Sequence, residues 1–315
     1  GKTATENRIV ASENWWKLRN SVEEQKETET GKDGGFKSVS GWLHNVIVSK
    51  HADAVEAYPE PNILPREAGD VTEAQQLTAI IPCVLEQNRF EHTYSHVMWQ
   101  KLKTGTGVYK VVWDAGKLNG LGDIAIDRVN LLNLFWEPGV TDIQHSRYVF
   151  HTEAVDKELL RAQYPELLSD KLKTSGFLAT RFLYDDAVDT TCKSAVVDWY
   201  YKRVGADGRT VLHYAKFTGD VLLYASENDP AYAEGGWYDH GQYPVVLDIL
   251  YPDEGSASGY GLIAVGRNPQ GYIDELDGHI LEYANTASRV RYWAKRSLGI
   301  NEKEFLDPDR RIIEV

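Results

Sequence analysis

The sequence is poor in cysteine and has no long apolar run. Its 315 residues include two cysteines, Cys83 and Cys192. Two cysteines do not make the disulfide framework of a small secreted domain, so we expect a reducing compartment and buried, packed thiols. No apolar run approaches the ~18–20 residues that a membrane-spanning helix needs, and no charged-then-apolar segment opens the chain. The sequence therefore predicts no membrane contact.

Positive charge is also scarce. Lysine and arginine total 34 against 47 aspartates and glutamates, which gives a net charge of −13. Proteins that bind duplex DNA tightly carry a basic surface, so the negative net charge argues against a repressor or a polymerase. It is compatible with a surface past which DNA slides without sticking, because tight phosphate contact would oppose sliding.

The overall composition is that of a folded protein. Hydrophobic residues make up 42% and charged residues 26% of the chain, whose length allows two or three cores. The chain starts at Gly1 without methionine, which suggests processing. It stops at Arg311–Val315, inside what reads as a strand without a partner. We therefore expect that C-terminal sequence is missing.

Periodicity predicts an α+β fold. Apolar spacing indicates helices over 5–20, 36–57, 70–103, 153–164 and 269–296, with the third kinked or restarted at Pro82. Residues 21–35 have almost no apolar content and are expected to be a mobile linker that a protease cuts first. Alternation predicts a hairpin over 108–129, a strand at 147–151, a meander of hairpins over 196–224 and a strand at 244–251.

Signals of catalysis or metal binding are weak. His92 and His96 lie four residues apart on a predicted helix and could supply two metal ligands, but no third ligand is apparent nearby. The alternative is a pair of ordinary surface histidines. No phosphate-binding glycine loop and no nucleophile elbow is present. Cys83 has no obvious base partner, so we predict neither a catalytic site nor a cofactor.

Acidic and aromatic residues are nevertheless plentiful. A glycoside hydrolase needs two carboxylates across a cleft flanked by aromatic platforms. Candidates are Asp185, Asp186, Glu227 and the run Trp237–His240, although loop carboxylates are usually solvated turn residues. A carbohydrate-active hydrolase is thus kept as a minor alternative.

Three features resemble the portal proteins of tailed bacteriophages. The first is the segment 123–155, where Asp127-Arg128-Val129 leads to the run NLFWEPG at 133–139 and then to a strand near 147–151. The second is Tyr243-Pro244 followed by SGYGL at 258–262, Asn268-Pro269-Gln270 and a long helix. The third is the order of elements over about residues 60–315. Asp274 departs from the pattern, because many relatives have Asn there.

The resemblance implies a particular domain division. It places a helical wing with a small sheet at 1–152, completed by a returning strand at 300–315. Long stem helices would lie at 153–190 and 256–292, a β-rich clip module at 191–255, and a tunnel-facing segment at 286–300. If the strands of 191–255 merged into one sheet with those of 108–151, the clip assignment would be wrong.

The resemblance also implies a function. Portal subunits form a closed ring, usually a dodecamer, at one capsid vertex, through which double-stranded DNA is packaged and ejected. Implied partners are further copies of the chain, the terminase, the capsid or scaffold protein and the head–tail adaptor. The implied location is the virion, after assembly in the bacterial cytoplasm. Another virion structural or adaptor protein is the alternative.

The predicted helix 269–296 is the candidate for contact between subunits. It has an apolar stripe, acidic residues in its first turns and basic residues in its last, which could pair with a neighbour's helix or simply offset the helix dipole. The candidate residues are Asp274, Glu275, Asp277, Arg289, Arg291, Lys295 and Arg296.

Overall fold

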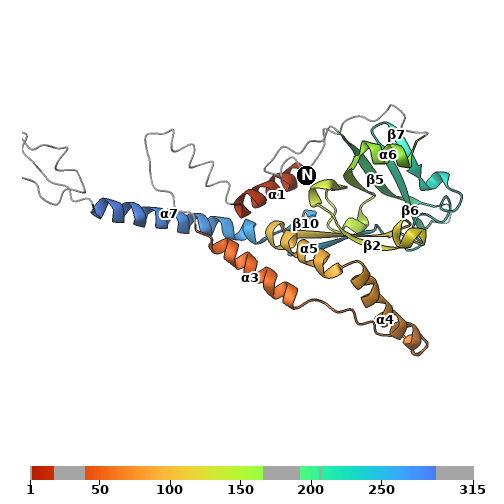
Figure 1. Cartoon of the computed structure of the whole chain (residues 1–315), viewed down its shortest axis with the longest axis horizontal. Coiled ribbons are helices and arrows are strands. Elements are labelled where there is room, and N and C mark those ends of the chain that lie inside the picture. The colour runs from red at the N-terminus through yellow and green to blue at the C-terminus, as the bar shows by residue number, and fades with distance from the viewer. Residues whose placement is uncertain (1, 18–39, 166–191, 206–207, 289–315) are drawn as a thin grey trace, which may run out of the picture.

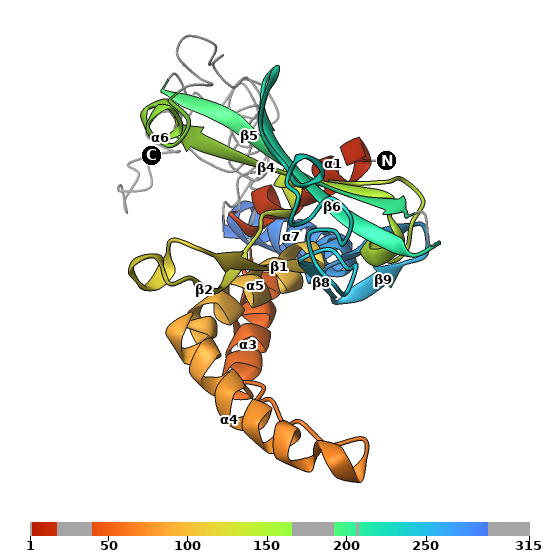
Figure 2. The ribbon, with the colours of Figure 1, turned by 90° about the vertical axis from the view of Figure 1, so that its right-hand side faces the viewer.

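The computed structural model describes residues 2–17, 40–165, 192–205 and 208–288 (Figure 1). They form a body of β-sheets flanked by helices, from which two helical projections leave in different directions (Figures 1 and 2). The helices are α1 (Lys2–Trp16), α3 (Trp42–Glu56), α4 (Val71–Gln87), α5 (Phe90–Thr104), α6 (Lys157–Gln163) and α7 (Leu262–Ser288). The mixture of helix and sheet confirms the predicted α+β class.

The strands form two main antiparallel sheets and a two-stranded ribbon. The first sheet has the order β2-β1-β8, the second β3-β4-β5-β6-β7, and β9 pairs with β10. Their bounds are β1 Thr106–Asp114, β2 Asp123–Arg128, β3 Leu134–Trp136, β4 Tyr148–Asp156, β5 Lys193–Val204, β6 Thr210–Thr218, β7 Val221–Ala225, β8 Val245–Ile249, β9 Tyr251–Asp253 and β10 Ser256–Tyr260. The β1–β2 hairpin and the β5–β6–β7 meander confirm the two clearest strand predictions.

The prediction of a separate β module over 191–255 is wrong. Strand β5 pairs along its length with β4, with His151 opposite Asp198. Strand β8 pairs with β1, with Val108 opposite Leu247. Local hairpin signals predicted the meander correctly, but they could not reveal these pairings between segments more than 35 residues apart.

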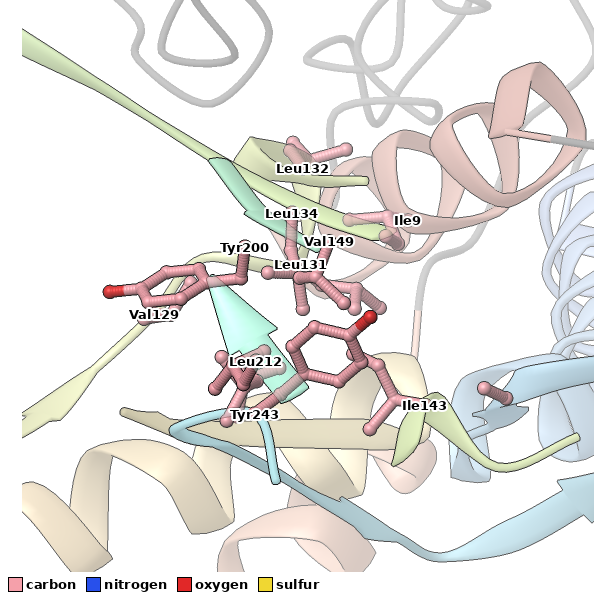
Figure 3. Packing of buried hydrophobic residues seen from close by; sticks show 13 residues of the cluster. Ile9, Val129, Leu131, Leu132, Leu134, Ile143, Val149, Tyr200, Leu212 and Tyr243 are labelled. Atoms are coloured by element: carbon pink, nitrogen blue, oxygen red, sulfur yellow. The ribbon is translucent and has the colours of Figure 1, made fainter. Parts of the chain in front are cut away.

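The main core lies between the two sheets (Figure 3). Val108 and Val245 of the first sheet and Val149, Tyr200 and Leu212 of the second are all buried there. Ile9 of helix α1 is also buried in this cluster. Because the inward-facing residues of both sheets share one core, the sheets form a single folding unit.

A buried ion pair crosses from one sheet to the other. The Lys110 ammonium on β1 donates to the Asp198 carboxylate on β5 at 2.8 Å and lies 3.2 Å from His151 Nδ1 on β4. The Tyr214 hydroxyl donates to the other Asp198 oxygen at 2.8 Å. Burial opposes the charge of Asp198, but the hydrogen bonds from His151, Lys110 and Tyr214 and the ammonium charge outweigh it and hold its pKa well below the usual value.

The long stretch predicted over 70–103 is two helices, and the break is not at Pro82. Helix α4 continues through Pro82, and the chain turns after Asn88, where Arg89 has a left-handed φ of 49°. The Asn88 amide donates to Val84 O at 2.8 Å and so satisfies a terminal carbonyl of α4. Helix α5 can then leave α4 and pack against β1.

The ends of several other elements differ from those predicted from the sequence. The segment at 153–156 continues strand β4, and Asp156 caps the short helix α6 by accepting from Glu158 N at 2.8 Å. Helix α3 starts at Trp42 rather than 36, and α7 starts at Leu262, with Pro269 inside it. Cys83 and Cys192 are exposed, not buried as predicted. The predicted linker at 21–35 and the returning strand at 300–315 lie outside the described residues.

The ion pair between the sheets makes a prediction about stability. The side chains of Lys110 and Asp198 are each 11% exposed, so Asp198→Asn leaves a buried ammonium without its counter-charge. Breaking such a pair costs about 3–5 kcal/mol. Urea unfolding at pH 7 should therefore show a much lower midpoint, whereas Asp53→Asn, in the exposed pair with Lys50, should change it little.

The effect should depend on pH in one direction. Because the pKa of Asp198 is lower in the folded than in the unfolded protein, its stabilising effect is present above the unfolded value of about 4 and is lost as the pH falls below it. The difference in unfolding free energy between wild type and Asp198→Asn should begin to shrink below about pH 5 and keep shrinking as the pH falls towards the folded pKa of Asp198. A difference that stays constant would contradict this assignment.

Candidate assembly surfaces

Helix α7 extends beyond the body into solvent (Figure 1). Its 27 residues span about 40 Å at 1.5 Å per residue. The outer part presents large apolar side chains to water; Leu276 is 61% exposed and Ile280 is 63% exposed. The others on this helix are Val265, Tyr272, Ile273, Leu281 and Tyr283. We call these five residues together with Leu276 and Ile280 the α7 stripe; an exposed apolar surface of this kind usually marks a contact site.

The base of α7 is fixed by one buried amide. Gln270 is 5% exposed, and its oxygen accepts from Leu43 N at 3.0 Å. Its nitrogen donates to Ser40 O at 3.0 Å, to Ser40 Oγ at 2.6 Å and to Asp274 Oδ1 at 2.9 Å. The same carboxylate oxygen accepts from Ser40 N at 2.8 Å and from Ser40 Oγ at 2.6 Å. This network joins α7 to the start of α3 and sets the direction of the projection.

The structure separates the predicted interface residues into different groups. Asp274 bonds to Ser40 and Gln270 of its own chain. Glu275 is exposed and lies 3.9 Å from His279, and Asp277 is partly exposed. Arg289, Arg291, Lys295 and Arg296 lie outside the described residues.

The expected acidic start of this helix is also wrong. Because α7 begins at Leu262, Asp274 stands about three turns inside it, and the first turn contains no acidic residue. A carboxylate so far from the end does not offset the helix dipole, which acts within the first turn. Sequence reasoning missed the network with Ser40, although the spacing of Gln270 and Asp274 at i, i+4 was a usable signal.

The second projection consists of α3, the segment 57–70 and α4, and points away from both sheets (Figure 2). Stacked rings hold its base against α5 and α1. His51 stacks on Trp99 at 3.8 Å, His44 stacks on Trp16 at 4.1 Å, and the two tryptophan rings lie 5.4 Å apart. Further out, Leu77 and Ile80 of α4 are exposed.

Asn88 sets the direction of α4 as Gln270 sets that of α7. Its side-chain oxygen accepts from Lys117 Nζ at 2.6 Å and from Ile126 N at 3.3 Å. Lys117 Nζ also donates to Ile124 O at 2.9 Å. These bonds connect the end of α4 to edge strand β2 and occupy two of its backbone groups, which protects part of the edge from pairing with another chain.

The β1–β2 hairpin carries a further apolar surface. Trp113 is 60% exposed, opposite Ile124 across the ladder. Val111 on the same face of β1, and Leu118 and Leu121 in the turn, are exposed as well. We call these five residues the hairpin patch; an exposed tryptophan among aliphatic side chains is typical of the centre of a protein interface.

The residues considered for hydrolysis do not form a site in the described chain. Burial opposes ionisation of Glu227, but hydrogen bonds from Arg203 and Tyr201 hold its pKa below the usual value, the reverse of what a general acid needs. The Trp237 ring lies 5.0 Å from that of Tyr214 and 4.8 Å from that of Tyr232, so it packs in an aromatic cluster. Asp185 and Asp186 lie outside the described residues.

None of the described helices is long and apolar enough to cross a membrane. Among the described residues no group of three or more His, Cys, Asp or Glu side chains could hold a metal ion.

The network at the base of α7 can be tested by Gln270→Ala. The substitution leaves Leu43 N and Ser40 O without their side-chain partner, which costs about 1–3 kcal/mol for a buried group. The thermal midpoint should fall, and amide exchange should accelerate at the start of α3. Gln76→Ala, at an exposed position of α4, is the matched control and should behave as wild type. Unchanged exchange at residues 43–46 would show that the amide does not hold α3.

Comparison with known proteins identifies the family. No curated protein matches this sequence. The sequence model described as phage P22-like portal protein matches residues 52–246, which include α4, the hairpin patch and strands β1 to β7. This match covers more than half of the chain and agrees with the resemblance in its residues, and the chain belongs to the P22-like phage portal protein family.

Proposed function

We propose that this chain is the subunit of a closed portal ring at one capsid vertex, through which double-stranded DNA is packaged and ejected. Portal proteins are structural components of the phage virion, at the connection of head and tail, and the family is not an enzymatic one. Within that family, the observation that carries the proposal is the α7 stripe, whose large apolar side chains are 39–76% exposed.

A ring requires two different faces on each subunit. In a head-to-tail contact one surface of a copy meets another surface of the next, and rotation then closes the ring. The α7 stripe and the hairpin patch are two such surfaces on separate elements. We propose that they supply the two sides of the contact, with Leu276 and Ile280 on one side and Trp113 on the other.

The finer assignments follow from the family. The ring is proposed to be a dodecamer that assembles in the bacterial cytoplasm and receives the terminase, the capsid or scaffold protein and the head–tail adaptor. The net charge of −13 supports passage of DNA without tight binding, because counterion-releasing phosphate contacts would hold the duplex in place. The wing, stem and tunnel assignments remain part of this proposal; the stem would include α7.

The first test removes the α7 stripe. Leu276→Gln with Ile280→Gln keeps good helix formers and replaces two exposed apolar side chains with polar ones, so the subunit should stay folded. Mass photometry should show fewer rings than for wild type at the same protein concentration. Leu159→Gln is the control, because Leu159 on α6 is 60% exposed and lies outside both surfaces. Normal rings in the double variant would remove the α7 stripe from the interface.

The second test distinguishes head-to-tail from symmetric contact. Trp113→Gln should also block rings, since it removes the centre of the hairpin patch. In a one-to-one mixture with the α7 variant, each subunit keeps one intact face, so the mixture should form heterodimers but no closed rings. Heterodimers absent from the mixture, or rings restored by it, would contradict contact between these two surfaces.

A further inference from the structure

Two histidines on α5 converge on one point. His92 and His96 are both exposed, and their Nε2 atoms lie 3.1 Å apart. The rings meet edge to face, with centroids 4.4 Å apart and planes inclined by 65°. At this separation one Nε2 carries a proton and the other accepts it, so a single proton lies between two ring nitrogens.

The geometry points to a divalent transition-metal site at this pair, and we propose that His92 and His96 chelate one such ion through Nε2. Imidazole bonds to zinc and similar ions are about 2.0–2.1 Å long, so nitrogens 3.1 Å apart subtend about 100° at a metal placed between them. That angle lies between the octahedral and the tetrahedral values. Binding requires the ring that carried the shared proton on Nε2 to take its Nδ1–H tautomer, so that both neutral rings ligate through Nε2 and no net proton is released.

An oxygen acceptor lies on the same face of α5 as the pair. Ligating histidines usually donate their other ring proton to an acceptor. The same face of α5 carries Gln100 four residues further on, whose buried Oε1 accepts no hydrogen bond among the described residues.

The chemistry of the donors sets the class of ion. Two imidazoles suit Zn²⁺, Ni²⁺ and Cu²⁺, whereas Mg²⁺ and Ca²⁺ prefer oxygen ligands. Two protein ligands leave the remaining coordination positions to water or to a donor from a bound molecule. The site lies on the exposed side of α5, apart from the α7 stripe, and the inference does not rest on ring assembly.

The test is titration of the purified full chain with Ni²⁺ in a non-coordinating buffer, followed by calorimetry. One ion should bind per chain at pH 7.5, with binding lost as the pH falls below about 6, where imidazoles become protonated. His92→Ala and His96→Ala should each weaken binding by at least about 10-fold, the lower end of what disturbing a metal site costs. Mg²⁺ should give no signal.

A matched variant separates this pair from other histidines. His145→Ala removes an exposed imidazole whose ring lies 3.5 Å from Asp142, and it should bind Ni²⁺ as the wild type does. Equal thermal midpoints would show that all three variants are folded. Binding that survives in His92→Ala with His96→Ala, or a wild type that binds no Ni²⁺ at this pH, would overturn the inference.

Discussion

The buried contact between Lys110 and Asp198 is the constraint on which the arrangement of the body depends. It is a buried polar link beside an apolar core, and it joins β1 of one sheet to β5 of the other. Apolar packing alone would tolerate small rotations of one sheet on the other, but an ammonium with a carboxylate at 2.8 Å and an imidazole at 3.2 Å tolerates few. The pair thus adds geometric specificity more than net stability, because the cost of desolvating both charges offsets much of their attraction.

Buried polar contacts also fix the directions of the two helical projections. Each leaves at a point where a single amide side chain satisfies several backbone or side-chain groups: Gln270 for α7 and Asn88 for α4. An amide suits this role because it donates and accepts without charge, so it can be buried between elements at little desolvation cost once every bond is made. The direction of each apolar surface is therefore fixed within the subunit, before any partner is present.

The sequence predicted what local signals encode. Turn residues and alternation placed the β1–β2 hairpin and the β5–β7 meander, and apolar spacing found most of the helices. The predictions failed where contacts between segments far apart in the sequence determine the structure. The pairings of β4 with β5 and of β8 with β1 merged the expected clip module into the body. The rule that proline breaks a helix placed a break at Pro82, although α4 continues through it. The charge of Asp274 was attributed to the helix dipole, although its hydrogen-bond partner Ser40 lies 234 residues away. The structural roles of Gln270 and Asn88 were missed for the same reason, because each side chain connects segments that are far apart in the sequence.

The outer half of α7 connects folding to assembly. Among the described residues, the hydrogen bonds between α7 and the start of α3 end at Asp274, and the apolar side chains beyond it are exposed. Helical stretches of this length are marginal in water by themselves, since most helix stability in proteins comes from packing an apolar face. A partner that covers Leu276 and Ile280 would supply that packing, so association and helix stability should rise together. A projection held rigidly at its base and left unpacked along its outer half binds at a defined angle, yet gains its full stability only within the assembly.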